Sequence, residues 1–274
     1  INATISYGFN STIIFGIGTY YLSSTSVISN ATGLTIMRQG IDQKLLVGTS
    51  IICIFYAQYC NGLKINSLSI DFDPLPFTAG YIVNVTDNYL DVEIQPPHRT
   101  DINRQVQGLI RYDRKEMRPA FGSKTYHFYQ VQPTNINTSL VSTSILRIPL
   151  TSRTELTIGD AIVTIYYIFI PSILVTDSTD LIIQSINIHS YWRIALVTNR
   201  VKRVIISDYY VILYDGRWLS ANSDCIHFIR TSEYISLSNS KCQRQSDDGL
   251  NVLTPYIIVA KAINTTTVIN QAFN

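Results

Sequence analysis

Isoleucine is the residue that most constrains what this chain can fold into, because it accounts for 41 of 274 residues. Tyrosine adds 18 more, whereas the chain holds only 4 Glu and 7 Lys. β-Branched and aromatic residues fit a pleated, half-buried surface, while Glu and Lys are depleted in strands. The composition therefore predicts a chain built from β-strands along its whole length.

Turn signals between strand-length apolar runs indicate how those strands are connected. Runs of this kind at regular spacing are typical of a sandwich or barrel. Asn61 and Gly62 stand between two runs and offer the positive φ values of a type I′ turn, so we expect a hairpin there. No internal repeat is visible, and the one helix we expect covers residues 103–110. We predict an all-β fold, a two-sheet antiparallel sandwich of jelly-roll or Greek-key topology with little helix.

The N-terminal segment, residues 1–22, is apolar and strand-like and precedes the first expected hairpin. Such a segment either pairs within its own domain or adds a strand to a neighbouring subunit. We predict an assembly arm at residues 1–22 and a single β-sandwich domain at residues 23–274, with two packed sandwiches as the alternative. The arm contacts are expected from Ile1, Ile5, Ile13, Ile14, Phe15, Tyr20 and Tyr21.

The longest apolar run, residues 161–175, is interrupted by Pro171. A membrane-spanning helix needs about 20 apolar residues, so we expect no membrane span.

The four cysteines differ in whether they can pair. If residues 50–60 form one strand, Cys53 and Cys60 lie ~23 Å apart. A disulfide needs Cα atoms within about 7 Å, so these two cannot pair. Cys225 and Cys242 can pair across a turn, and a set of buried thiols is the alternative.

The acceptor pattern Asn-x-Ser/Thr occurs six times, against roughly 3.4 matches expected by chance. Glycans at these positions would place the chain outside the cell or on its surface. The acceptor residues are Asn2, Asn10, Asn30, Asn84, Asn137 and Asn264.

The common catalytic motifs, such as a nucleophile elbow or a phosphate loop, do not occur in the sequence. Asp71 and Asp73 share a strand face but are too few to hold calcium. Asp247 and Asp248 precede Gly249 and are interpreted as a turn. The four glutamates offer no carboxylate pair that we can nominate for glycosidase chemistry. We predict no catalytic residue, no metal site, no cofactor and no enzymatic activity.

Basic residues gather in the most polar stretch of the chain, residues 99–118, which we interpret as an exposed contact loop. Neither terminus carries the dense basic run of a genome-binding arm, so we expect weak contact with nucleic acid at most. The cations of this stretch are Arg99, Arg104, Arg111, Arg114, Lys115 and Arg118.

The balance of residue types favours a chain that buries a wide surface against partners. Large interfaces are depleted in Lys and Glu and rich in aromatic residues and Arg. This chain has 18 Tyr and 14 Arg beside its 7 Lys and 4 Glu. Our leading hypothesis is a non-enzymatic structural subunit that assembles with copies of itself or with sibling subunits.

In composition, rich in Thr, Ser, Asn, Ile, Val and Tyr, and in starting at Ile1 rather than Met, the chain resembles the jelly-roll coat proteins of small icosahedral viruses. The resemblance is one of class and rests on no specific motif. It implies a capsid protein of the virion, forming a shell through large β-rich interfaces.

Two alternatives stay open. The first is a secreted, glycosylated surface protein, either an adhesin, a pilin-like filament subunit or a viral glycoprotein domain. Its N-terminal segment would donate a strand to a neighbour, and its partner would be a host receptor or glycan. The second is a carbohydrate-binding or sugar-active β-sandwich, which a pocket lined by Trp192, Trp218 and carboxylates would favour.

Overall fold

The computed structural model describes residues 9–39, 45–100, 104–120, 126–127, 137–150, 155–166, 168–214, 216–253, 258–262 and 268–271. The elements within these ranges are all β-strands, as the composition predicts. None of the described residues belongs to a helix long and apolar enough to cross a membrane.

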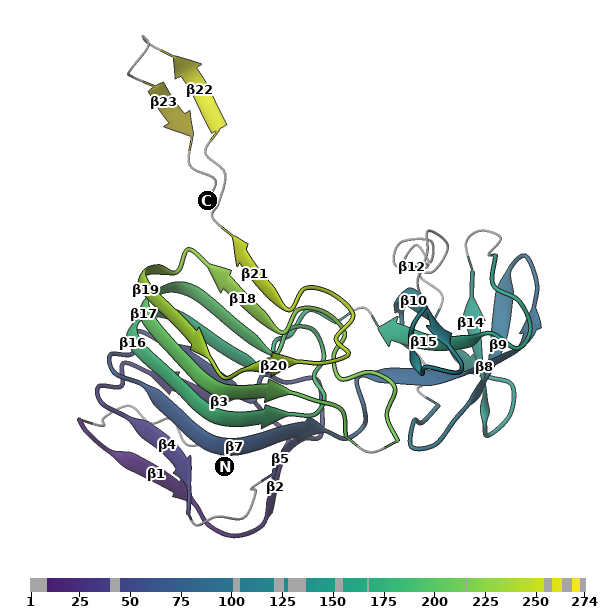
Figure 1. Ribbon diagram of the computed structural model, residues 1–274, viewed down its shortest axis with the longest axis horizontal. Coiled ribbons are helices and arrows are strands. Elements are labelled where there is room, and N and C mark those ends of the chain that lie inside the picture. Colours follow the sequence, from purple (N-terminus) through teal and green to yellow (C-terminus); the bar gives the residue numbers. More distant parts are fainter. Residues whose placement is uncertain are drawn as a thin grey trace.

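The larger part of the chain is a parallel β-solenoid, seen on the left of Figure 1 as a stack of aligned arrows. Its 13-stranded sheet is formed by parallel pairing between strands of successive coils of the chain. Parallel pairs such as β16 with β17 keep the coils in register over their whole length. The solenoid strands are β1 (Thr12–Phe15), β2 (Thr19–Leu22), β3 (Ser26–Ser29), β4 (Thr35–Arg38), β5 (Leu45–Gly48), β6 (Phe55–Gln58), β7 (Lys64–Phe72), β16 (Ile173–Ile188), β17 (Leu196–Val211), β18 (Ile226–Ile229), β19 (Ser232–Ser238), β20 (Lys241–Cys242) and β21 (Leu250–Leu253).

The solenoid overturns the predicted antiparallel jelly-roll sandwich, and the turn at Asn61 shows why. The strands on either side of Asn61, β6 and β7, pair with neighbouring coils rather than with each other. Asn61 itself bridges in parallel to Thr32 and Thr179 of those coils. The positive φ of Gly62, 75°, therefore bends the chain onto the next face instead of reversing it. A hairpin turn and a solenoid corner use the same residue types, so the sequence pattern predicted the wrong strand partner.

Residues with positive φ mark three corners of the solenoid, and each corner repeats at the same register position from coil to coil. The first corner contains Asn30, Tyr59, Asp177, Arg200 and Arg230. The second contains Asn10, Gly33, Gly62, Asp180, Arg203 and Glu233. The third contains Ser67, Ser185, Asp208 and Asn239.

Ion pairs between coils accompany the left-handed backbone at these corners, which carries an intrinsic steric cost for residues with a Cβ atom. Arg203 donates to both oxygens of Asp180 at 2.6 and 2.8 Å, and it reaches Glu233 of the next coil at 2.5 Å. Arg200 makes the same bidentate contact with the Asp177 carboxylate. Each pair joins residues that stack directly above one another.

The N-terminal segment is part of the solenoid, because β1 and β2 pair with β4 and β5 of the next coil. Ile13, Phe15 and Tyr20 pack against the main core, while Ile14 and Tyr21 are exposed. The described part of the predicted assembly arm is therefore paired within its own chain. Ile1 and Ile5 lie outside the described residues.

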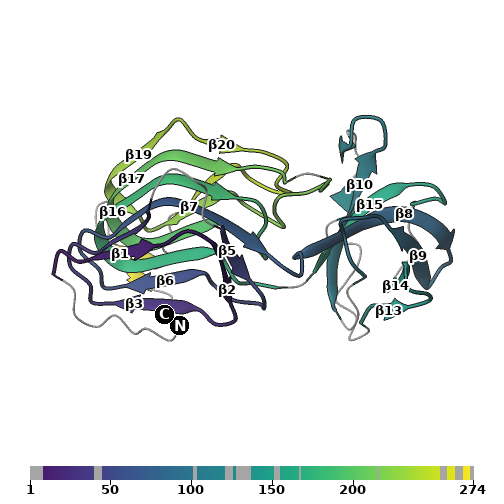
Figure 2. The same ribbon diagram turned by 90° about the horizontal axis from the view of Figure 1, so that it is seen from below.

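A second unit is inserted between β7 and β16, on the right of Figures 1 and 2. It is an 8-stranded sheet whose main strands are antiparallel neighbours in the order β11-β10-β15-β8-β9-β14-β13, with β12 beside β10. The helix expected at residues 103–110 does not form in the described part of that range, since residues 106–110 are the first five residues of β10. The strands are β8 (Phe77–Val85), β9 (Tyr89–Ile94), β10 (Val106–Asp113), β11 (Arg118–Pro119), β12 (Tyr126–His127), β13 (Ser139–Leu140), β14 (Ile145–Pro149) and β15 (Ala161–Tyr166).

The solenoid and the insert share a packed junction. Trp218 of the solenoid belongs to the same buried cluster as Phe77 and Tyr112 of the insert. The Tyr112 hydroxyl donates to the Trp218 carbonyl at 3.0 Å, and Asn222 Nδ2 donates to the Pro76 carbonyl at 2.7 Å. The chain ends in a small antiparallel hairpin of β22 (Ile258–Ala262) and β23 (Val268–Gln271).

We predict that Gly62 is needed for its backbone conformation rather than for space. A Cβ atom at this position meets nothing closer than Gly33 at 3.6 Å, yet φ is +75°. Gly62→Ala should therefore lower the free energy of unfolding by about 1–2 kcal/mol, and Gly62→Asn by less, because Asn tolerates this region better. Urea denaturation of both variants measures the difference.

Gly16→Ala is the matched control for this experiment. Its φ is not positive, and its Cβ atom would lie 3.5 Å from the Tyr20 hydroxyl. Equal losses for Gly62→Ala and Gly62→Asn would show that conformation is not the cause.

Candidate active site

Three aspartates of the last two solenoid coils converge on one point. Asp224, Asp247 and Asp248 each offer a carboxylate oxygen, and these oxygens all lie within 4.8 Å of one another. Asp224 is buried, whereas Asp247 and Asp248 are exposed. We call these three residues the aspartate cluster.

Register between coils produces this convergence. Leu196, Ile226 and Leu250 are partners in β17, β18 and β21. Counting back two residues from the last two reaches Asp224 and Asp248, which therefore stack one coil apart. The amide of Cys225 donates to the carbonyl of Asp248 at 2.9 Å and fixes this alignment.

Hydrogen bonds hold the carboxylates in place. Asn251 Nδ2 donates to Asp248 Oδ2 at 3.2 Å, and the Asp248 amide donates to Asp247 Oδ1 at 3.0 Å. The Ser223 hydroxyl donates to Asp224 Oδ1 at 3.2 Å. These bonds come from backbone or from short side chains, so the cluster is held without long, mobile groups.

A disulfide bond joins a neighbour of the aspartate cluster to strand β20. Cys225, the neighbour of Asp224, is bonded to Cys242 of β20 with a Cα–Cα separation of 6.0 Å. This is the pair that the sequence offered as a disulfide. Cys53 and Cys60 are buried thiols.

Burial raises the pKa of Asp224 above its ordinary value, and the nearby charges of Asp247 and Asp248 raise it further. The Ser223 hydrogen bond and His227, whose Nδ1 lies 3.3 Å from Asp224 Oδ2, oppose this shift. Asp224 therefore keeps its proton to a higher pH than an isolated aspartate would.

The cluster also has the donor type of a hard-cation site. Calcium takes six to eight oxygen ligands, and three carboxyl groups supply only part of that set. The arrangement fits acid–base chemistry better, because one carboxyl group is buried and two face solvent.

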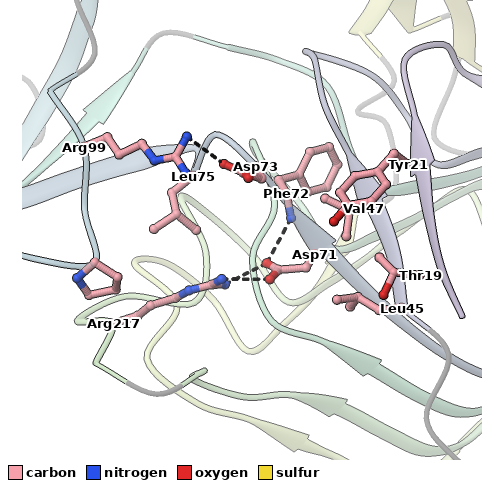
Figure 3. A pocket seen from close by; sticks show the side chains of 11 residues that line it. Thr19, Tyr21, Leu45, Val47, Asp71, Phe72, Asp73, Leu75, Arg99 and Arg217 are labelled. Carbon is pink, nitrogen blue, oxygen red and sulfur yellow. Dashed lines mark hydrogen bonds and ion pairs between the residues drawn. The ribbon is translucent and has the colours of Figure 1, made fainter.

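A pocket of about 310 Å³ lies elsewhere, where the first coils meet the insert (Figure 3). Its floor is an ion pair in which Arg217 donates to both oxygens of Asp71 at 2.6 and 2.7 Å. Ser190 and the Phe72 amide also donate to Asp71, so its carboxylate is fully engaged. At the rim, Arg99 pairs with Asp73 at 3.2 Å. These contacts make the floor of the pocket a structural link between coils.

The basic stretch predicted as a contact loop is a strand and hairpin instead, since residues 106–113 form β10. Arg111 pairs with Asp160 at 2.7 Å, and Arg114 donates to the Gly159 carbonyl at 3.2 Å. Arg104 lies over the ring of Trp192 at 5.7 Å. Lys115 lies in the turn that leads into β11, and Arg118 is the first residue of β11. The contacts of Arg104, Arg111 and Arg114 tie the segment to its own chain.

The six acceptor asparagines differ in exposure. The exposed ones are Asn10, Asn30 and Asn137. Asn84 is half-buried, and its Nδ2 donates to Asp91 Oδ2 at 3.1 Å. Asn2 and Asn264 lie outside the described residues. Glycosylation stays a prediction.

Sequence reasoning missed the aspartate cluster because it read Asp247–Asp248–Gly249 as a turn. Trp192 and Trp218, the aromatic residues considered for a sugar pocket, are instead buried at 1% and 7% exposure. No constant repeat length pointed to the cluster, because the coils that separate the aligned Leu196, Ile226 and Leu250 are 30 and 24 residues long. Asp224 and Asp248 are separated by the second of these intervals, which places them one above the other.

No family model matches the chain. The chain is 22% identical over 227 residues to alpha-1,3-galactosidase A of Shewanella woodyi. This alignment covers 76% of this chain and 37% of that protein. The match therefore covers little more than a third of the length of this curated relative. Among solved structures, a protein of Parabacteroides merdae provisionally described as a glycosyl hydrolase aligns with 89% of this chain and 81% of its own. Its identity is 13% and its TM-score 0.30, values too low to support an argument.

The expectation of a non-enzymatic, self-assembling capsid protein is wrong. The similarity to a galactosidase points towards an enzyme, and the solenoid replaces the jelly roll on which the capsid hypothesis depended. Of the hypotheses drawn from the sequence, the sugar-active one is nearest, although its sandwich scaffold is not what the chain forms.

Removing one charge from the cluster should lower the pKa of Asp224. Asp247→Asn takes away a like charge that favours the protonated form, so Asp224 should lose its proton at a lower pH than in the parent protein. Carbon-13 NMR titration of the aspartate carboxyl groups measures this shift. Asp208→Asn, at a corner of the solenoid, is the control and should leave Asp224 unchanged. A titration of Asp224 that is the same in all three proteins would contradict the coupling.

Proposed function

We propose that the protein hydrolyses a glycosidic bond, with a galactose-containing glycoside as its substrate class. The observation that carries this proposal is the aspartate cluster, in which one buried carboxyl group is held against two exposed ones. Glycoside hydrolases use carboxyl groups as the acid and the base that flank the scissile bond. The similarity to an alpha-1,3-galactosidase supports the choice of galactose.

The cluster can supply both groups because burial and the neighbouring charges raise the pKa of Asp224 and favour its protonated form. The carboxyl group that keeps its proton donates it to the oxygen of the leaving group as the bond from that oxygen to the anomeric carbon breaks. An ionised carboxylate of the cluster attacks the anomeric carbon as that bond breaks and forms a glycosyl ester, a step that needs two closely spaced carboxyl groups such as these, whose oxygens lie within 4.8 Å of one another. Water then attacks the anomeric carbon and displaces this carboxylate, while the first carboxylate accepts a proton from the water and so regains the one it gave to the leaving group. The products are a free sugar and an alcohol.

The disulfide supports a location in an oxidising compartment, because structural disulfides persist in secreted and periplasmic proteins. Such a location suits an enzyme that meets glycans outside the cytosol. Localisation therefore stays a proposal that follows from the chemistry of Cys225 and Cys242.

Asparagine substitutions in the cluster should abolish most hydrolysis. Asp224→Asn, Asp247→Asn and Asp248→Asn each remove a proton donor or acceptor at nearly constant volume, and general acid–base groups contribute about 10²–10⁴-fold to rate. Release of galactose from α-1,3-linked galactobiose, with folding checked by thermal melting, measures the loss. Asp208→Asn, at a corner of the solenoid, is a matched control that should retain turnover.

Two further measurements sharpen the test. The variant that lacks the acid should keep more activity on α-galactosyl fluoride, because fluoride leaves without protonation. Chelation by EDTA should leave the parent activity unchanged if the cluster works as an acid and base. Parent-level activity in all three asparagine variants would sink the proposal.

A further inference from the structure

An exposed aromatic ring lies at the junction of the solenoid and the insert, on the coils that precede the aspartate cluster. Phe169 is 54% exposed, although it belongs to the segment that returns the chain from the insert to β16. Ligand sites combine aromatic side chains with a few polar groups that fix the orientation of the ligand. Phe169 can be the aromatic part of such a site if polar side chains lie beside it.

One polar side chain lies over this ring and binds a second polar side chain. The guanidinium of Arg193 lies 4.2 Å from the centre of the Phe169 ring, and Arg193 donates to Gln107 Oε1 at 3.1 Å. Gln107 is on β10 of the insert, while Arg193 is in the solenoid loop that leads into β17. The three residues come from three separate segments, and both units are needed to form the group.

Register places this group beside the cluster. Counting back three residues from the aligned Leu196, Ile226 and Leu250 reaches Arg193, Ser223 and Asp247 in successive coils. Neighbouring strands are spaced by 4.7–4.9 Å, so the backbones of Arg193 and Asp247 lie roughly 10 Å apart. That separation is about the length of one or two sugar rings.

We propose that Phe169, Arg193 and Gln107 form a sugar-binding subsite next to the aspartate cluster. The ring of Phe169 packs on the apolar face of a sugar unit, while Arg193 and Gln107 hydrogen-bond its hydroxyl groups. The substrate is then a disaccharide or longer glycan, and the insert contributes directly to its selection. This inference rests on the proposed function for the identity of the bond that is cleaved.

The test compares a substrate that fills the subsite with one that cannot. Galactobiose linked α-1,3 spans the cluster and a neighbouring position, whereas α-galactosyl fluoride carries a single sugar unit. Phe169→Ala should raise KM for the disaccharide by about tenfold, the equivalent of ~1.4 kcal/mol. It should change the kinetics on the fluoride little, and Phe169→Tyr should restore the parent KM for the disaccharide.

Tyr234→Ala is the matched control, because it removes another half-exposed aromatic ring, on β19 and 55% exposed. It should leave KM unchanged on both substrates. Hydrolysis in which Phe169→Ala and the parent show equal KM for the disaccharide would overturn the subsite and leave the proposed function standing.

Calorimetric titration with the same disaccharide tests whether the subsite binds sugar even if the protein does not hydrolyse it. Binding that is lost in Phe169→Ala, in a protein that does not hydrolyse the sugar, would support the subsite and reject the proposed function. Absence of binding to the parent protein would overturn the subsite itself.

Discussion

Parallel register between successive coils is the constraint on which the rest of this structure depends. Backbone hydrogen bonds hold each residue of β17 directly above its partner in β16, and the same alignment continues into β18 and β21. A side chain at one position is therefore repeated in space about every 4.8 Å. Both the corner ion pairs and the aspartate cluster follow from this alignment, although one serves stability and the other is proposed to serve chemistry.

The sequence predicts strands well and their partners poorly. Residues 64–72 form a strand whose apolar side chains Leu68, Ile70 and Phe72 are buried, as strand-forming composition predicts, although Ser69 and Asp71 on the other face are buried as well. Which strand lies beside it depends on where the chain goes after each turn. Gly62 permits a positive φ in a hairpin and in a solenoid corner alike, so its residue type does not decide between them. The corners also use Tyr59, Arg200 and Arg230, which no turn pattern would select.

The candidate site was hidden for the same reason. Asp224 is separated in sequence from Asp247 and Asp248, and only the coil length brings them together. A catalytic motif of contiguous residues would have been visible, but a motif spread over two coils is visible only once the register between coils is known. The disulfide was within reach of sequence reasoning, since Cys225 and Cys242 are close enough in the chain to pair across one turn.

The insert divides the solenoid in sequence without dividing it in space. β7 and β16 pair directly, even though about a hundred residues separate them, and Phe77 and Ile165 at the two ends of the insert are partners in β8 and β15. Closing a disordered loop of about 100 residues rather than one of about six costs roughly 2–3 kcal/mol more in chain entropy. An insert that folds first brings its own ends together and removes most of that entropy term. A folded insert thus holds β7 and β16 close together and lowers the entropy cost of pairing the two parts of the solenoid.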